Sequence, residues 1–116
     1  MAVLETSLRS QRRDGALAFD LTVENRGDDP VELTFPDAQR LRVSLYPADA
    51  DGEASPVWRS DADRMFAQVL GSETIPAGEN VTFSAAWKEP ASGEYHAVGE
   101  MTCQNRDVTA EETVLI

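Results

Sequence analysis

Apolar and polar side chains alternate with a period of two along most of this chain, and this pattern limits the folds open to it. In ALAFDLTVEN, for example, Leu17, Phe19, Leu21 and Val23 alternate with small or polar residues. Such alternation indicates a strand with one buried and one solvated face, as in antiparallel sheets. The same pattern recurs at residues 4–8, 31–35, 41–45, 81–87, 95–103 and 108–116.

Turn sequences separate these segments, and their spacing predicts the fold. They are RGDDP, PADADGEASP, PAGE and KEPASG, each of which contains both Gly and Pro. Turns at intervals of about 8–12 residues are typical of an immunoglobulin-like antiparallel β-sandwich. We therefore expect an all-β fold of about seven to nine strands, with RGDDP forming a hairpin or a sandwich corner. The length of 116 residues predicts a single domain over 1–116.

One stretch, PVWRSDADRMFAQVL at residues 56–70, breaks the pattern. A polar SDADR sequence lies between Trp58 and the adjacent pair Met65 and Phe66. Helical spacing of the apolar residues fits a short helix over Asp61–Leu70, but we favour a turn followed by a strand. In a packed arrangement Trp58 and Phe66 would fill the core, Arg59 would pair with an acid, and Ser60 and Asp61 would cap the turn.

The charge balance argues against some classes of partner. There are 21 acidic and 10 basic residues, a net charge of −11, and Lys88 is the only lysine. An acidic excess with arginine in place of lysine indicates a salt-adapted source, although an ordinary acidic domain fits the same numbers. The sequence contains no basic patch or stripe, so we expect no nucleic acid and no anionic membrane surface as partners.

The first twenty residues contain no continuous apolar run, and no 18-residue apolar stretch occurs anywhere. We therefore expect neither an export signal nor a membrane anchor, and a cytoplasmic location.

No combination of residues indicates catalysis. His96 is expected on the solvated face of its strand and Cys103 on the inward face, as a small core residue. Asp49, Asp51 and Glu53 lack the ligand spacing of a calcium loop and are expected to form a solvated acidic loop. We expect no catalytic residue, no cofactor and no metal, and a protein that binds rather than an enzyme.

An ordered series of short motifs carries a family resemblance. The motifs are Asn25 at the end of the first long strand, VWRS, MFAQ, IPAGE, Trp87 and SGEY. Over about residues 15–104 this series resembles the BsuPI domain, the intracellular proteinase inhibitor family. The chain departs from the family pattern in lacking a second aromatic after Arg59 and in its acidic Asp61–Arg64 stretch. The matching positions, which we expect to be structural, are Asn25, Trp58, Arg59, Ser60, Phe66, Gln68, Pro76, Gly78, Glu79, Trp87, Gly93 and Tyr95.

The resemblance implies a small immunoglobulin-like sandwich that inhibits a subtilisin-like serine protease inside the cell. A contact loop would place Met65 or Phe66 in an apolar pocket of the protease, and Pro47–Pro56 and Lys88–Gly93 are other candidate loops. An alternative is a general interaction or assembly module that binds through a sheet edge. A third interpretation is a sandwich that binds a carbohydrate or another ligand through exposed tryptophans.

Overall fold

The alternating segments form strands in the computed structural model, which describes residues 3–48, 55–62 and 65–116. The described residues contain nine strands and no helix, and therefore none long and apolar enough to cross a membrane. The strands are β1 (Leu4–Arg13), β2 (Ala16–Asn25), β3 (Val31–Phe35), β4 (Leu41–Pro47), β5 (Trp58–Arg59), β6 (Gly71–Ile75), β7 (Asn80–Trp87), β8 (Glu94–Met101) and β9 (Thr109–Leu115).

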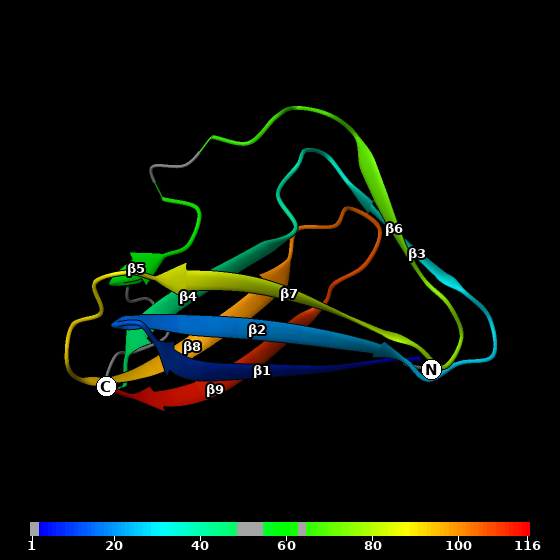
Figure 1. Cartoon of the computed structure of the whole chain (residues 1–116). Coiled ribbons are helices and arrows are strands. Elements are labelled where there is room, and N and C mark those ends of the chain that lie inside the picture. The colour runs from blue at the N-terminus through cyan, green and yellow to red at the C-terminus, as the bar shows by residue number, and fades with distance from the viewer. Residues whose placement is uncertain (1–2, 49–54, 63–64) are drawn as a thin grey trace.

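The strands form three antiparallel sheets, ordered β1-β2-β7, β5-β4-β8-β9 and β3-β6. The first two lie face to face, and the β3-β6 ribbon extends beyond them (Figure 1). This arrangement confirms the all-β sandwich. β2 pairs with β1 and β7 rather than with β3, so RGDDP forms a corner between sheets and not a hairpin.

The core is built from the inward positions that the alternation predicts. Phe19, Leu21 and Val23 of β2 and Val43 and Leu45 of β4 are fully buried. Each such side chain contributes roughly 1.5–3 kcal/mol through removal of apolar surface from water. Because both sheets supply these residues, the core holds the two layers together.

β6 was not expected from the sequence. Its inward positions hold Gly71, Glu73 and Ile75, so only one of the three is a large apolar residue. Its partner β3 shows the alternation clearly, and pairing such as Val31 with Ile75 brings β6 into the sheet. β6 therefore forms because it pairs with β3, which is distant in the sequence, and not because of its own alternation.

β1 and β9 close one side of the sandwich. The hydroxyl of Thr6 on β1 donates a hydrogen bond to the carbonyl of Thr109 on β9 at 2.8 Å. Leu8 also packs over Gly99 of β8, where an added Cβ would lie 3.1 Å from a Leu8 methyl carbon. The first and last strands thus lie against each other, as Figure 1 shows along the bottom of the molecule.

Candidate functional site

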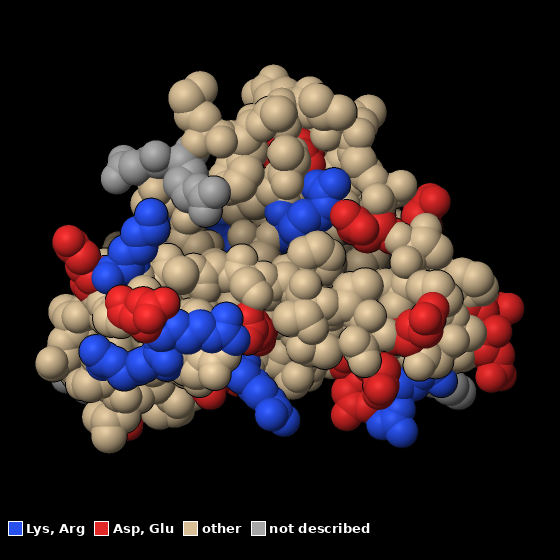
Figure 2. Space-filling view, in the orientation of Figure 1, with Lys and Arg blue, Asp and Glu red and all other residues tan. Residues whose placement is uncertain are grey.

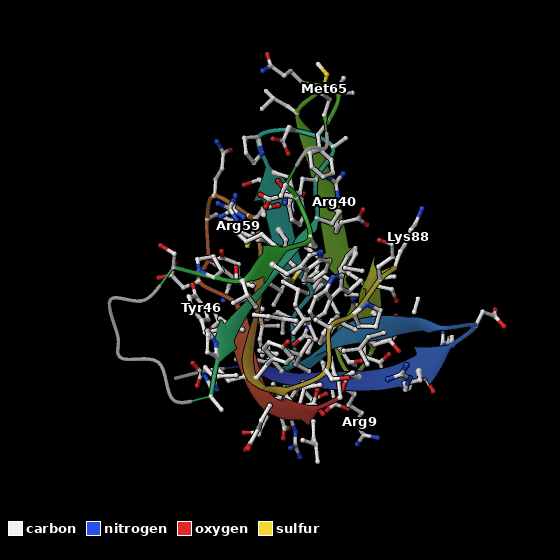
Figure 3. All side chains as sticks on the ribbon, turned by 90° about the vertical axis from the view of Figure 1, so that its left-hand side faces the viewer. Arg9, Arg40, Tyr46, Arg59, Met65 and Lys88 are labelled. Atoms are coloured by element: carbon white, nitrogen blue, oxygen red, sulfur yellow. The ribbon has the colours of Figure 1, made fainter. Side chains whose placement is uncertain are left out.

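The chain between β5 and β6 presents apolar side chains to solvent. We refer to residues 60–70, of which 60–62 and 65–70 are described, as the β5–β6 segment. Met65 is 99% exposed, and Val69 and Leu70 are also exposed. Figure 3 shows Met65 at the far end of the molecule, pointing away from the sheets.

Residues 65–70 form neither the strand we favoured nor the alternative helix. The carbonyl of Ala67 accepts hydrogen bonds from the backbone N–H groups of Ala38, at 2.9 Å, and Val69, at 3.0 Å. The second bond spans only two residues and makes a tight turn. The backbone therefore turns where a strand would continue straight.

The adjacent side chains of Met65 and Phe66 lie in different environments. Phe66 is half-buried and borders a small hollow of about 180 Å³ with Leu41, Phe83 and Ala85. Met65 makes almost no contact with the rest of the chain. Of the two candidate contact residues, only Met65 is fully available to another molecule.

Ser60 fixes the start of the segment to β4. Its backbone N–H donates to the carbonyl of Val43 at 2.9 Å, and its Oγ accepts from the Val43 N–H at 2.9 Å. Ser60 is buried, so these bonds continue the β4–β5 pairing by one residue. Both of these bonds go to β4 rather than to the turn that follows Ser60.

Asp61 collects hydrogen bonds from three side chains, and only 10% of its side chain is exposed. Its carboxylate accepts from Arg42 at 2.8 Å, Arg59 at 2.9 Å and Gln39 at 3.4 Å. Burial acts to raise the pKa of Asp61, but hydrogen bonds from Arg42 and Arg59 outweigh it and lower the pKa. The expected pairing of Arg59 with an acid is confirmed, and Asp61 joins β4, β5 and the segment.

Arg40 supports the other end of the segment. Its guanidinium lies over the ring of Phe35 at 4.3 Å and donates to Glu73 at 3.2 Å and to the carbonyl of Asp37 at 2.8 Å. A Cβ at Gly71, where the segment joins β6, would lie 2.6 Å from a guanidinium nitrogen. Glycine at this position therefore leaves room for Arg40. Neither Arg40 nor Gln39 was singled out from the sequence, because a polar residue before a strand is an ordinary sequence feature.

Asn25 is fully buried and joins three pieces of chain. Its side-chain amide donates to the carbonyls of Asp29 and Ile75, each at 2.8 Å, and its Oδ1 accepts from the Gly27 N–H at 2.9 Å. These bonds satisfy buried backbone groups at the sandwich corner.

The remaining family positions lie mostly in turns. Pro76 accepts from the N–H of Glu79 at 3.1 Å across a turn in which Gly78 has φ +79°, a value that favours glycine. The Tyr95 hydroxyl donates to the carbonyl of Ala91 at 3.0 Å, across the turn that contains Gly93. Gln68 is exposed on the β5–β6 segment.

Trp58 and Trp87 form part of an aromatic stack. Trp58 stacks against Phe19, with centroids 6.0 Å apart, and against Trp87, at 5.6 Å. Trp87 in turn meets Tyr95 edge-on at 5.7 Å. Because the indole of Trp58 stacks on two neighbouring rings, this arrangement gives little support to sugar stacking on an exposed tryptophan face.

The acidic residues considered as metal ligands give no evidence of a site. Asp49, Asp51, Glu53 and Arg64, with most of the Pro47–Pro56 loop, lie outside the described residues. Within the described ranges no group of three His, Cys, Asp or Glu side chains could hold a metal ion.

His96 and Cys103 also lie apart from the β5–β6 segment. His96 Nε2 lies 3.3 Å from the carboxylate of Glu111 on the neighbouring strand. Cys103 follows β8, packs against the core, and has its thiol pKa raised by burial.

Comparisons with known proteins connect this fold to a family. The family profile described as BsuPI, intracellular proteinase inhibitor, matches residues 4–106. A search among curated proteins found no match.

Two solved structures show the likeness in fold. One is a penta-heme cytochrome c552 from Thermochromatium tepidum, with a TM-score of 0.58 and 8% identity, over 97% of this chain and 40% of that one. The other is a β-glucosidase, EmGH1, from Erythrobacter marinus, with a TM-score of 0.52 and 12% identity, over 97% of this chain and 15% of that one. This chain thus spans less than half of either protein, and at such identities the likeness concerns the fold alone.

Proposed function

The chain belongs to the BsuPI family of intracellular proteinase inhibitors, and we propose that it restrains a subtilisin-like serine protease in the cytoplasm by placing its β5–β6 segment in the protease cleft. Met65 enters an apolar specificity pocket of the protease in this proposal. The chain contributes binding and no catalytic residue of its own.

One observation carries the proposal: Met65 is 99% exposed on a segment whose two flanks are bonded to the rest of the fold. An exposed loop binds tightly only if little conformational freedom is lost on binding. Ser60 and Asp61 hold one flank and Ala67 the other. The methionine side chain itself adapts easily to an apolar pocket.

The exposed side chains of Val69 and Leu70 extend the apolar surface beyond Met65. They would contact the rim of the cleft once Met65 is seated. Phe66, which borders the hollow beside Leu41, would support the segment from below and meet the protease only at its edge.

The test is a titration of the purified chain against a subtilisin-type intracellular protease from a salt-adapted source, in molar potassium chloride. Residual protease activity should fall linearly to an end point at a one-to-one ratio. Mass spectrometry afterwards should find the chain intact. If the folded chain leaves every such protease fully active, the proposed function is wrong.

Paired variants test the contact. Met65→Asp should weaken inhibition by at least about thirtyfold, because it places a charge in an apolar pocket. Leu115→Asp is the matched control, since Leu115 is 82% exposed on β9, and it should inhibit like the parent chain. Equal inhibition by the Met65→Asp variant would rule out the segment as the contact while leaving the inhibitory activity standing.

A further inference from the structure

The outer edge of β7 lacks a neighbouring strand. β7 pairs with β2 along one side, and in the described part of the chain no strand pairs with its other side. In an antiparallel strand every second residue directs its N–H and C=O away from its partner. Within the described part of the chain, these outward-directed groups of β7 have no strand partner and form a template for another strand.

Two neighbouring hollows lie beside this edge, and we refer to them together as the β7 groove. Its wider part, about 850 Å³, lies between Trp58, Arg59 and Ser60 on one side and Ala86, Trp87 and Lys88 on the other. Its narrower part, about 180 Å³, continues beside residues 83–85 towards Phe66. Ser60 borders both parts, so the groove follows the direction of β7.

Basic side chains outnumber acidic ones in the lining of the β7 groove, whereas the chain as a whole is acidic. The lining includes three basic residues, Arg40, Arg59 and Lys88, and one acidic residue, Glu89. The chain as a whole has 21 acidic and 10 basic residues. Figure 3 shows Arg59 and Lys88 on opposite sides of this end of the molecule, with Arg40 between them.

Lys88 is the cation most available to a ligand. Arg59 and Arg40 already pair with Asp61 and Glu73 from outside the groove lining. Among the described residues no carboxylate lies within 4.0 Å of the Lys88 ammonium. A bound carboxylate would give this ammonium a partner that the described residues do not supply.

We propose that the β7 groove binds an extended peptide with acidic side chains, which joins the three-stranded sheet as an additional strand beside β7. Backbone hydrogen bonds to β7 supply affinity, and the basic rim selects acidic side chains. A second copy of this chain fits less well, because each copy carries a net charge of −11. The inference goes beyond the proposed inhibition, since it uses neither Met65 nor a protease.

The test uses fluorescein-labelled peptides of eight residues, the length of β7. One peptide alternates valine with glutamate and the other valine with lysine. Fluorescence anisotropy in low salt should saturate for the glutamate peptide and give at least about tenfold weaker binding for the lysine peptide. Amide hydrogen exchange on the full chain should slow at alternate residues of β7 when the glutamate peptide binds.

Variants and modified peptides complete the test. Lys88→Glu should weaken binding of the glutamate peptide about tenfold, whereas Arg9→Glu, on the outer face of the sheet far from the groove (Figure 3), should leave it unchanged. Methylation of every second peptide nitrogen should abolish binding when the methylated nitrogens are those that face β7. Methylation of the other set, which faces away from β7, should be tolerated.

Four results of the peptide experiments would overturn the proposal. They are the absence of saturable binding, equal binding of both peptides, equal effects of the two charge reversals, and unchanged exchange at β7. A dimer that protects the β7 edge without peptide would also overturn it, by assigning the edge to a second copy.

Discussion

Three buried or nearly buried polar residues, Asn25, Ser60 and Asp61, fix the irregular parts of this sandwich. Each bonds a group that is distant in the sequence, as when Asn25 donates to Ile75 or Ser60 accepts from Val43. The motif positions that held Asn25 and Ser60 could be identified from the sequence. Their partners could not, because a hydrogen bond to the backbone leaves no trace in the partner's residue type.

Asn25→Ala should destabilise the fold by roughly 3 kcal/mol, because two carbonyls and one N–H would lose their partner in a buried place. The matched control is Asn105→Ala. Asn105 also bonds two backbone groups, those of Thr34 and Glu32, but it is exposed and water can replace it. Urea unfolding of both variants measures the difference, and equal losses would contradict the structural role of Asn25.

Asp61→Asn should destabilise the chain by about 1–3 kcal/mol at neutral pH, because Arg42 and Arg59 lose their ion pairs and can donate only to a neutral amide. The folded pKa of Asp61 lies below its ordinary value of 3.8. Its stabilisation is therefore fully present above pH 3.8 and is lost as pH falls through the lower folded pKa. Unfolding free energies of both proteins from pH 7 to about pH 2 should converge at the acid end; a constant gap would contradict this assignment.

At the scale of elements, alternation in the sequence located most of the strands but did not locate β6. β2, β3, β4, β7 and β8 follow the expected segments closely. β6 shows weak alternation because Gly71 and Glu73 occupy inward positions, and residues 65–70 are apolar without forming a strand. Apolar residues thus indicate burial only where a neighbouring element is present to cover them, and the sequence does not show where one is missing.

Trp58 holds the two-residue strand β5 against β4 through its stack with Phe19 and Trp87. Trp58→Ala should destabilise the fold by about 3 kcal/mol. This is the lower end of the usual range for truncating a large aromatic side chain, because Trp58 is only half-buried. Trp58→Phe, which keeps an aromatic ring in the stack, should lose less. Urea unfolding measures both changes, and amide exchange at Ser60 should accelerate in the alanine variant; unchanged exchange would contradict the anchoring role.

At the scale of the whole molecule, net charge is the dominant property. Acidic side chains are spread over the visible face with basic ones between them (Figure 2). A net charge of −11 also causes general repulsion within the folded chain.

Raising potassium chloride from 0.1 to 1 M should increase the melting temperature, because the screening length falls from about 10 Å to about 3 Å. Calorimetry across this range measures the shift. A melting temperature that falls with salt would mean that the ion pairs, such as Arg42 with Asp61, outweigh the repulsion.

The contact between β1 and β9 has a consequence for how large an assembly can grow. The sheet β1-β2-β7 has two ends, and the chain's own last strand lies against one of them, leaving β7 at the other. A guest strand that adds at β7 would therefore lengthen this sheet in one direction only, because β1 at the opposite edge is covered by β9.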